Sequence, residues 1–192
     1  EKWLLANTDI GGLETAVKQT LKISIPSRPC VILGTGGAAR AAITSMASVL
    51  CPLIEIRSRT PERAAAFLDD LKKLGFSNVK SAAQDAPLPK GALVINATPL
   101  GLKTGDPSPL NPALLKDGMA VFDTTYAPAP SALLKAAAAK NLPHSDGLPM
   151  LAAQGYHALN LWLENRLRFH LDDIFMERML AAACLALKQK TT

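Results

Sequence analysis

The chain has 192 residues, 48% of them hydrophobic, which is enough length and apolar content to bury the core of one domain. It contains no apolar run long enough to cross a membrane and no segment typical of a signal peptide, so we expect a cytoplasmic protein. The formal net charge is +5, but the basic residues are scattered and only 5% of residues are aromatic. We therefore expect no direct binding of nucleic acid.

Cysteine and histidine are too few and too dispersed to indicate a metal centre or a disulfide framework. The three cysteines, an odd number, are far apart in the chain: Cys30, Cys51 and Cys184. The histidines form no pair with a carboxylate or thiol at ligand spacing: His144, His157 and His170. We expect buried free thiols in a reducing compartment and no metal site.

Apolar runs and helical segments alternate along the chain. The pattern predicts helices over residues 11–21, 38–50, 61–74 and 131–140, and two long helices from residue 149 onward with a break near 171–173. It predicts strands over residues 30–33, 53–57, 78–81, 92–96 and 119–123, and a surface loop over 103–112. The main strands are apolar throughout, which is typical of parallel strands covered on both faces. We therefore predict a doubly wound parallel α/β sheet with extra C-terminal helices.

A glycine-rich turn follows the first predicted strand directly. Gly34, Gly36 and Ala39 match the dinucleotide-binding spacing G-x-G-x-x-G/A. The first glycine permits a tight turn, the second lets a pyrophosphate approach the backbone, and the alanine allows close packing of helix and strand. The N-terminus of the following helix favours an anion. Glycine-rich strand-to-helix turns without a ligand also exist, so this motif alone leaves that alternative open.

The second predicted strand ends in a basic segment. An NAD site usually has Asp or Glu here for the ribose 2′-hydroxyl, whereas a 2′-phosphate calls for Arg. This chain has Ser58 at that place, followed by Arg59 and, one helical turn later, Arg63. A guanidinium pairs bidentately with phosphate, so the sequence favours NADP over NAD. The alternative is that both arginines are solvated charges at a helix start.

Six separated segments together resemble the shikimate dehydrogenase family, which includes quinate/shikimate dehydrogenases and the dehydrogenase part of fungal multifunctional shikimate-pathway proteins. The segments are Asn7-Thr8-Asp9, Gly34-Thr35-Gly36-Gly37-Ala38-Ala39-Arg40, Ser58-Arg59-Thr60, Asn96-Ala97-Thr98-Pro99-Leu100-Gly101, Asp123-Thr124-Thr125-Tyr126 and Asp146 to Gln154. Ser58 stands where the family usually has Asn, and residues 163–187 depart from the usual ending of the family.

The resemblance implies a Rossmann-like cofactor lobe of a two-lobed NADP-dependent enzyme. Residues 1–28 are expected to connect to an N-terminal substrate lobe, residues 29–148 to bind the dinucleotide, and residues 149–192 to form the C-terminal helices. The family moves a hydride between NADPH and 3-dehydroshikimate. Its catalytic lysine and carboxylate-binding serine pair lie in the N-terminal lobe, so we expect the 192 residues alone to be inactive and to self-associate.

The resemblance also implies roles for single residues. Asp9 matches the catalytic aspartate, although spacing alone favours a role as the cap of helix 11–21. The substrate-binding positions are Asn7, Tyr126 and Gln154; the last two also fit half-buried packing and a polar helix surface. The expected cofactor-binding residues are Gly34, Thr35, Gly36, Gly37, Ala38, Ser58, Arg59, Thr60, Arg63, Asn96, Thr98 and Met150.

A second interpretation of the same segments stays open. Quinate-responsive fungal repressors resemble the same enzymes without catalysing their reaction, so the chain also fits a non-catalytic ligand-binding domain of such a regulator. Asp9, Tyr126 and Gln154 favour the enzyme, whereas Ser58 and the divergent C-terminus fit either protein. The preference for shikimate over quinate stays open as well.

Overall fold

Six parallel strands form one sheet in the order β3-β2-β1-β4-β5-β6 in the computed structural model, which describes residues 5–167 and 170–189. The strands are β1 (Cys30–Leu33), β2 (Ile54–Arg57), β3 (Val79–Ser81), β4 (Leu93–Asn96), β5 (Ala120–Asp123) and β6 (His144–Ser145). The strand order reverses between β1 and β4, which is the topological switch point of a doubly wound fold. The predicted fold class is confirmed.

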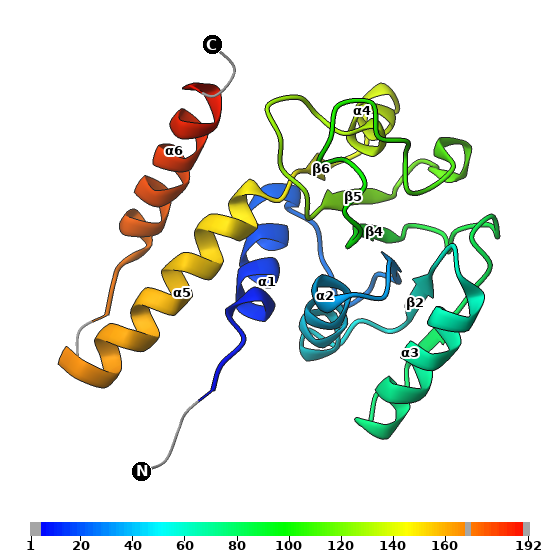
Figure 1. Cartoon of the computed structure of the whole chain (residues 1–192), viewed down its shortest axis with the longest axis horizontal. Helices are drawn as coiled ribbons and strands as arrows, with labels where there is room; N and C mark the ends of the chain where they lie inside the picture. Colours follow the sequence, from blue (N-terminus) through cyan, green and yellow to red (C-terminus); the bar gives the residue numbers. More distant parts are fainter. Residues whose placement is uncertain (1–4, 168–169, 190–192) are drawn as a thin grey trace.

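Over the same described ranges, six α-helices and one short 3₁₀ helix connect or flank the strands (Figure 1). They are α1 (Thr8–Leu21), α2 (Gly37–Ser48), α3 (Pro61–Lys73), η1 (Pro112–Leu114), α4 (Ala132–Ala139), α5 (Leu148–Leu167) and α6 (Asp173–Gln189). Local chemistry explains several starts. Pro61 occupies the first turn of α3, where its missing N–H costs nothing, and the Ser131 hydroxyl accepts a hydrogen bond from Leu134 N–H at the start of α4.

The two faces of the sheet carry separate hydrophobic cores. Cys30 and Ile32 of β1 point into the core shared with α1, α2 and α3. Val31 and Leu33, the alternate residues, point into the core shared with α4 and the segment around Leu115. Because successive side chains of a strand point to opposite faces, both alternate sets of β1 side chains are buried, and both are apolar, as predicted.

The start of α1 corrects one expectation from the sequence. The helix begins at Thr8, three residues before the predicted start, and Asn7 is its cap: Asn7 Oδ1 accepts a hydrogen bond from Asp9 N–H at 3.0 Å. Asp9 lies inside the first turn and is not the cap. An Asn side chain at the cap satisfies an orphan helical N–H, which lets the helix start ahead of its apolar positions.

Other expectations differ in detail. The two-residue strand β6 was not predicted, because two residues carry no readable period. Cys30 and Cys51 are free and buried as expected, whereas Cys184 is only partly buried. Within the described part of the chain, no helix could span a membrane and no group of three ligating side chains could hold a metal ion.

Helices α1, α5 and α6 form a layer beside the sheet (Figure 1). Helix α1 packs on α2 and α5, and α5 in turn packs on α6. The approach of α1 to α5 is close, because a Cβ built on Gly12 would lie 2.9 Å from the Cβ of Gln154 and 3.0 Å from its backbone nitrogen. Nearby, His157 Nε2 and the Thr15 hydroxyl lie 3.1 Å apart, within hydrogen-bonding distance, so this histidine joins the two helices.

Gly12→Ala should destabilise the protein, although alanine is the better helix former by about 1 kcal/mol. The new methyl group meets backbone atoms of α5, and overpacking of this kind costs about 1–3 kcal/mol, so after the gain in helix propensity we expect a net loss of up to about 2 kcal/mol. Gly155→Ala is the matched control, since the nearest atom there is the mobile Met179 methyl carbon at 3.1 Å. Denaturant unfolding measures both; a stabilised Gly12→Ala protein would contradict the packing described here.

Candidate functional site

An open cleft of about 530 Å³ lies at the carboxyl ends of β1, β2 and β4. In α/β sheets ligands bind at this edge, beside the switch point. Eight of the twelve predicted cofactor-binding residues line it: Gly34, Thr35, Gly36, Ser58, Arg59, Thr60, Arg63 and Thr98. The fold thus brings together the glycine turn and the basic segment that the sequence placed on separate strands.

The glycine turn has the backbone geometry that the spacing predicts. Gly34 has a φ of 111°, and a Cβ there would lie 2.9 Å from the Ala97 carbonyl oxygen of the neighbouring loop. At Gly36 and Gly37, in contrast, a Cβ would have no atom within 4 Å, so the space above the start of α2 is open. Gly36 caps α2 without a side-chain hydrogen bond, which leaves the N–H groups of that turn available to an anion.

Four arginines line the cleft, and their partners differ. Arg59 and Arg63 are exposed and have no hydrogen bond or ion pair with any residue that the structure describes. Arg40 donates to Asp70 Oδ2 at 3.1 Å, and its guanidinium lies 4.8 Å from the centre of the Phe67 ring. Both members of this pair are about half exposed, and exposed pairs of this kind contribute only about 0.2–1 kcal/mol.

Arg57, the fourth arginine, is completely buried and fully hydrogen-bonded. Its Nε and Nη2 donate to Glu55 Oε1 at 2.9 and 2.6 Å. Its remaining N–H groups donate to three backbone carbonyls, those of Gln84, Ala86 and Pro87. All five N–H donors of the guanidinium are therefore used, and none remains for a ligand.

The loop after β4 is organised by a buried polar network under the cleft. Asn96 is fully buried: its amide group donates to the Leu100 carbonyl and to Asp123 Oδ1, and its oxygen accepts from the N–H and hydroxyl of Thr98. Asp123 also accepts from the hydroxyl of Ser131 at 2.6 Å. Asn96, predicted to border the cofactor, thus lies beneath the cleft and shapes the turn that carries Thr98.

Three further predicted cofactor residues do not line the cleft either. Gly37 and Ala38 lie in the first turn of α2, next to the lining residue Gly36. Met150 lies in α5, is 7% exposed and packs in the core that α1 and α2 share with the sheet. A methionine in an apolar helix satisfies both patterns, which is why the sequence did not separate them.

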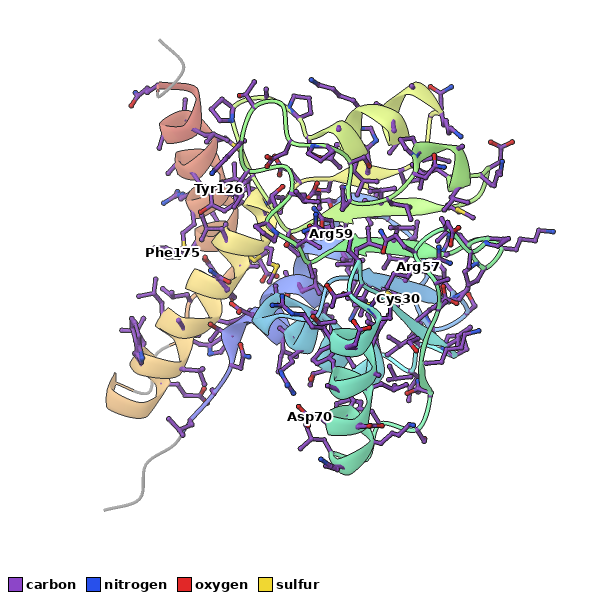
Figure 2. All side chains as sticks on the ribbon, turned by 45° about the vertical axis from the view of Figure 1, so that its right-hand side comes forward. Cys30, Arg57, Arg59, Asp70, Tyr126 and Phe175 are labelled. Carbon is purple, nitrogen blue, oxygen red and sulfur yellow. The ribbon has the colours of Figure 1, made fainter. Side chains whose placement is uncertain are left out.

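The predicted substrate-side residues come from three elements. Asn7 and Asp9 stand at the start of α1, Gln154 lies on α5 where that helix meets Gly12, and Tyr126 follows β5 with 37% of its surface exposed. Asp9 is partly exposed, and no residue in the described ranges donates a hydrogen bond to its carboxylate. In Figure 2 Tyr126 lies on the side of the sheet that faces the C-terminal helices, away from Asp70.

Two carboxylates, those of Asp106 and Asp146, accept hydrogen bonds from backbone N–H groups in the loops after β4 and β6. Burial raises the pKa of Asp146, and the nearby Asp123 adds to that effect, while the hydrogen bond from Leu148 N–H opposes it. The N–H groups of Gly101 and Lys103 lower the pKa of Asp106 by donating to its carboxylate. Both side chains are therefore occupied in caps and turns of the backbone.

Known proteins are similar to this chain in sequence and in structure. No family model matches the chain. A curated shikimate dehydrogenase (NADP(+)) of Citrifermentans bemidjiense is 32% identical over 162 residues, which cover 81% of this chain and 56% of that protein. A solved shikimate dehydrogenase in complex with NADP+ superposes with a TM-score of 0.81 at 30% identity, over 94% of this chain and 62% of that one. The chain is homologous to the shikimate dehydrogenases.

A second solved relative, the shikimate 5-dehydrogenase of Thermus thermophilus in complex with NADP(H) and shikimate, agrees with this assignment. Its TM-score is 0.73 at 31% identity, over 92% of this chain and 62% of that one. This shikimate dehydrogenase homologue spans a little over half the length of the curated relatives that it matches. The resemblance stated from the six segments is confirmed.

The role of Arg57 in this homologue was missed by reasoning from the sequence. A charged pair within the predicted strand, Glu55 and Arg57, was the available signal, because alternate residues of a strand share one face. On that face the loop around Gln84 lies against β2, and the arginine satisfies the loop carbonyls. Arg40, although part of the glycine motif, was likewise not expected among the site residues.

Arg57→Met should lower the free energy of unfolding by about 3–5 kcal/mol, because it leaves three carbonyls without their donor and the buried Glu55 carboxylate with only the Lys80 ammonium, 3.6 Å from Oε2. Arg63→Met, an exposed arginine lining the same cleft, is the control and should change stability by less than about 0.5 kcal/mol. Urea unfolding followed by circular dichroism compares the two. Equal stability of both variants would show that the buried pair contributes nothing.

Proposed function

We propose that this chain binds NADP(H) in the cleft and forms the cofactor-binding part of a shikimate or quinate dehydrogenase, which moves a hydride between NADPH and 3-dehydroshikimate. One observation carries the proposal. The open glycine turn before α2 lines one cleft together with Arg59 and Arg63, which have no partner among the described residues, and position 58 holds serine instead of a carboxylate. The matched relatives support NADP(H) as the cofactor, because the curated one is named shikimate dehydrogenase (NADP(+)) and the solved one is in complex with NADP+.

The residues present fit a dinucleotide carrying a 2′-phosphate. A Cβ at Gly36 or Gly37 would meet no atom, so the turn has room for a pyrophosphate next to the first N–H groups of α2. Arg59 and Arg63 supply two cations for the 2′-phosphate. Ser58 holds the turn that carries Arg59, because its hydroxyl accepts a hydrogen bond from Thr60 N–H at 3.2 Å.

The substrate side is proposed at the amino end of α1 and the facing part of α5. When bound, the nicotinamide supplies or accepts the hydride. The Asp9 carboxylate, free of protein donors in the described chain, orients a substrate hydroxyl and supports a cationic proton donor. Gln154 donates to and accepts from substrate hydroxyls, and the Tyr126 hydroxyl adds a further contact. Asn7 fixes the start of α1 and thereby the place of Asp9.

We expect this chain to bind NADP(H) more tightly than NAD(H). Arg59→Ala should weaken NADP binding about tenfold to a hundredfold, which is the range for losing a hydrogen bond to a charged group, and should change NAD binding by less than about threefold. Lys72→Ala is the control, because Lys72 lies on α3 outside the cleft and pairs with Asp69. Calorimetric titration measures the affinity of each of the three proteins for both cofactors. Equal wild-type affinities for the two cofactors would contradict the assignment.

We also expect the 192 residues alone to oxidise shikimate and quinate at a negligible rate. The proposed lysine and serine pair lie outside them, and positioning the reactants can account for about 7–11 kcal/mol of an activation barrier. The assay is NADP reduction by these residues with shikimate and with quinate. Fast turnover by the 192 residues would refute the expectation. In any longer chain that contains these residues, loss of turnover on Asp9→Asn would support the enzyme, whereas quinate binding without turnover would support a regulator.

A further inference from the structure

We propose that Arg40 is a third ligand of the 2′-phosphate, held back by Asp70, and that this pair sets the affinity of the cleft for adenosine that carries a 2′-phosphate. The inference rests on the proposed NADP site and goes beyond it. Arg40 lies in α2 and lines the cleft together with Arg59 and Arg63 on its other wall. It is thus an additional cation at the site, beyond the two that the sequence assigns to the 2′-phosphate.

The position of the Arg40 guanidinium is set by two contacts on α3. It stacks 4.8 Å from the centre of the Phe67 ring and donates one hydrogen bond to Asp70 Oδ2. Arg63, Phe67 and Asp70 follow each other at spacings of four and three residues, so they lie along one side of α3. Asp70 is about 10 Å farther along the helix than Arg63, at a rise of about 1.5 Å per residue.

The Asp70 pair therefore draws Arg40 away from the arginines at the start of α3. In Figure 2 Arg59 lies at the edge of the sheet, whereas Asp70 lies well down α3. The other N–H groups of the Arg40 guanidinium have no acceptor among the residues that the structure describes. A guanidinium with free donors beside two unpaired cations is suited to an incoming phosphate, which it can bind bidentately.

The pair with Asp70 is weak enough to be exchanged for a phosphate. Both side chains are about half exposed, 47% for Arg40 and 50% for Asp70, so solvent and salt screen their attraction. Asp70 is also the only carboxylate that lines the cleft in the described part of the chain. Arg57 offers the contrast: it lines the same cleft, but burial and five hydrogen bonds keep it from moving.

The test uses two probes that differ only in the 2′-phosphate, adenosine 2′,5′-bisphosphate and adenosine 5′-monophosphate, titrated calorimetrically into the whole 192-residue chain. Arg40→Gln should weaken binding of the bisphosphate about tenfold, as expected for a lost hydrogen bond to a charged group, and leave the monophosphate within about twofold. Asp70→Asn should strengthen binding of the bisphosphate about threefold, because an exposed ion pair no longer competes.

Two controls separate this mechanism from a general change of charge. Asp69→Asn removes the neighbouring carboxylate, which lies outside the cleft and pairs with Lys72, and should leave both affinities unchanged. In the Arg40→Gln background, Asp70→Asn should have no effect on the bisphosphate, since its effect passes through Arg40. Melting curves confirm that each variant is folded.

The outcomes distinguish the two proposals. A wild-type chain that prefers the bisphosphate, together with silent Arg40 and Asp70 variants, overturns this inference and keeps the proposed NADP site. Strengthening by Asp70→Asn that persists without Arg40 also overturns it, because the carboxylate then acts directly on the phosphate. A wild-type chain that binds neither probe, or binds both equally, overturns the proposed cofactor site and this inference together.

Discussion

The buried ion pair of Glu55 and Arg57 is the interaction on which the cleft depends. On the face of the sheet to which these residues point, the loop through Gln84, Ala86 and Pro87 lies against Arg57 of β2. A loop laid over a sheet brings carbonyl groups that need donors, and burying them unpaired is costly. One arginine satisfies three of them while its charge is balanced by a neighbour two residues away.

This arrangement also fixes what the next residues can do. Because Arg57 is anchored, β2 ends at a defined point, and Ser58 and Arg59 follow it directly into the cleft. The arginines of the site therefore divide by burial. Arg57 is buried, and all its N–H donors are used within the protein. Arg59 and Arg63 are exposed and line the cleft, where their N–H donors can bind an anion. Arg40 is intermediate: it lines the cleft, is about half exposed, and forms one weak ion pair, with Asp70.

The helical layer contributes a second constraint. Gly12 lets α1 approach the backbone of α5 at Gln154, and the Thr15–His157 contact links the same two helices. The proposed substrate residues Asp9 and Gln154 lie on these two helices and not on the sheet itself. Tight packing between two helices restricts their relative movement, which suits side chains that must keep a fixed distance from a cofactor bound at the sheet edge.

The sequence by itself determined the fold class, most elements to within a few residues and the main features of the cleft, because these follow from local signals. Strands apolar on both faces, a glycine spacing and a basic segment after the second strand are all readable without a partner. The start of α1 was misjudged because the cap at Asn7 outweighed the hydrophobic pattern. Single placements were decided only by the tertiary structure. Asn96 sits under the cleft, Met150 in the core, and Arg57 and Arg40 take opposite roles, since burial and hydrogen-bond partners come from segments distant in the chain.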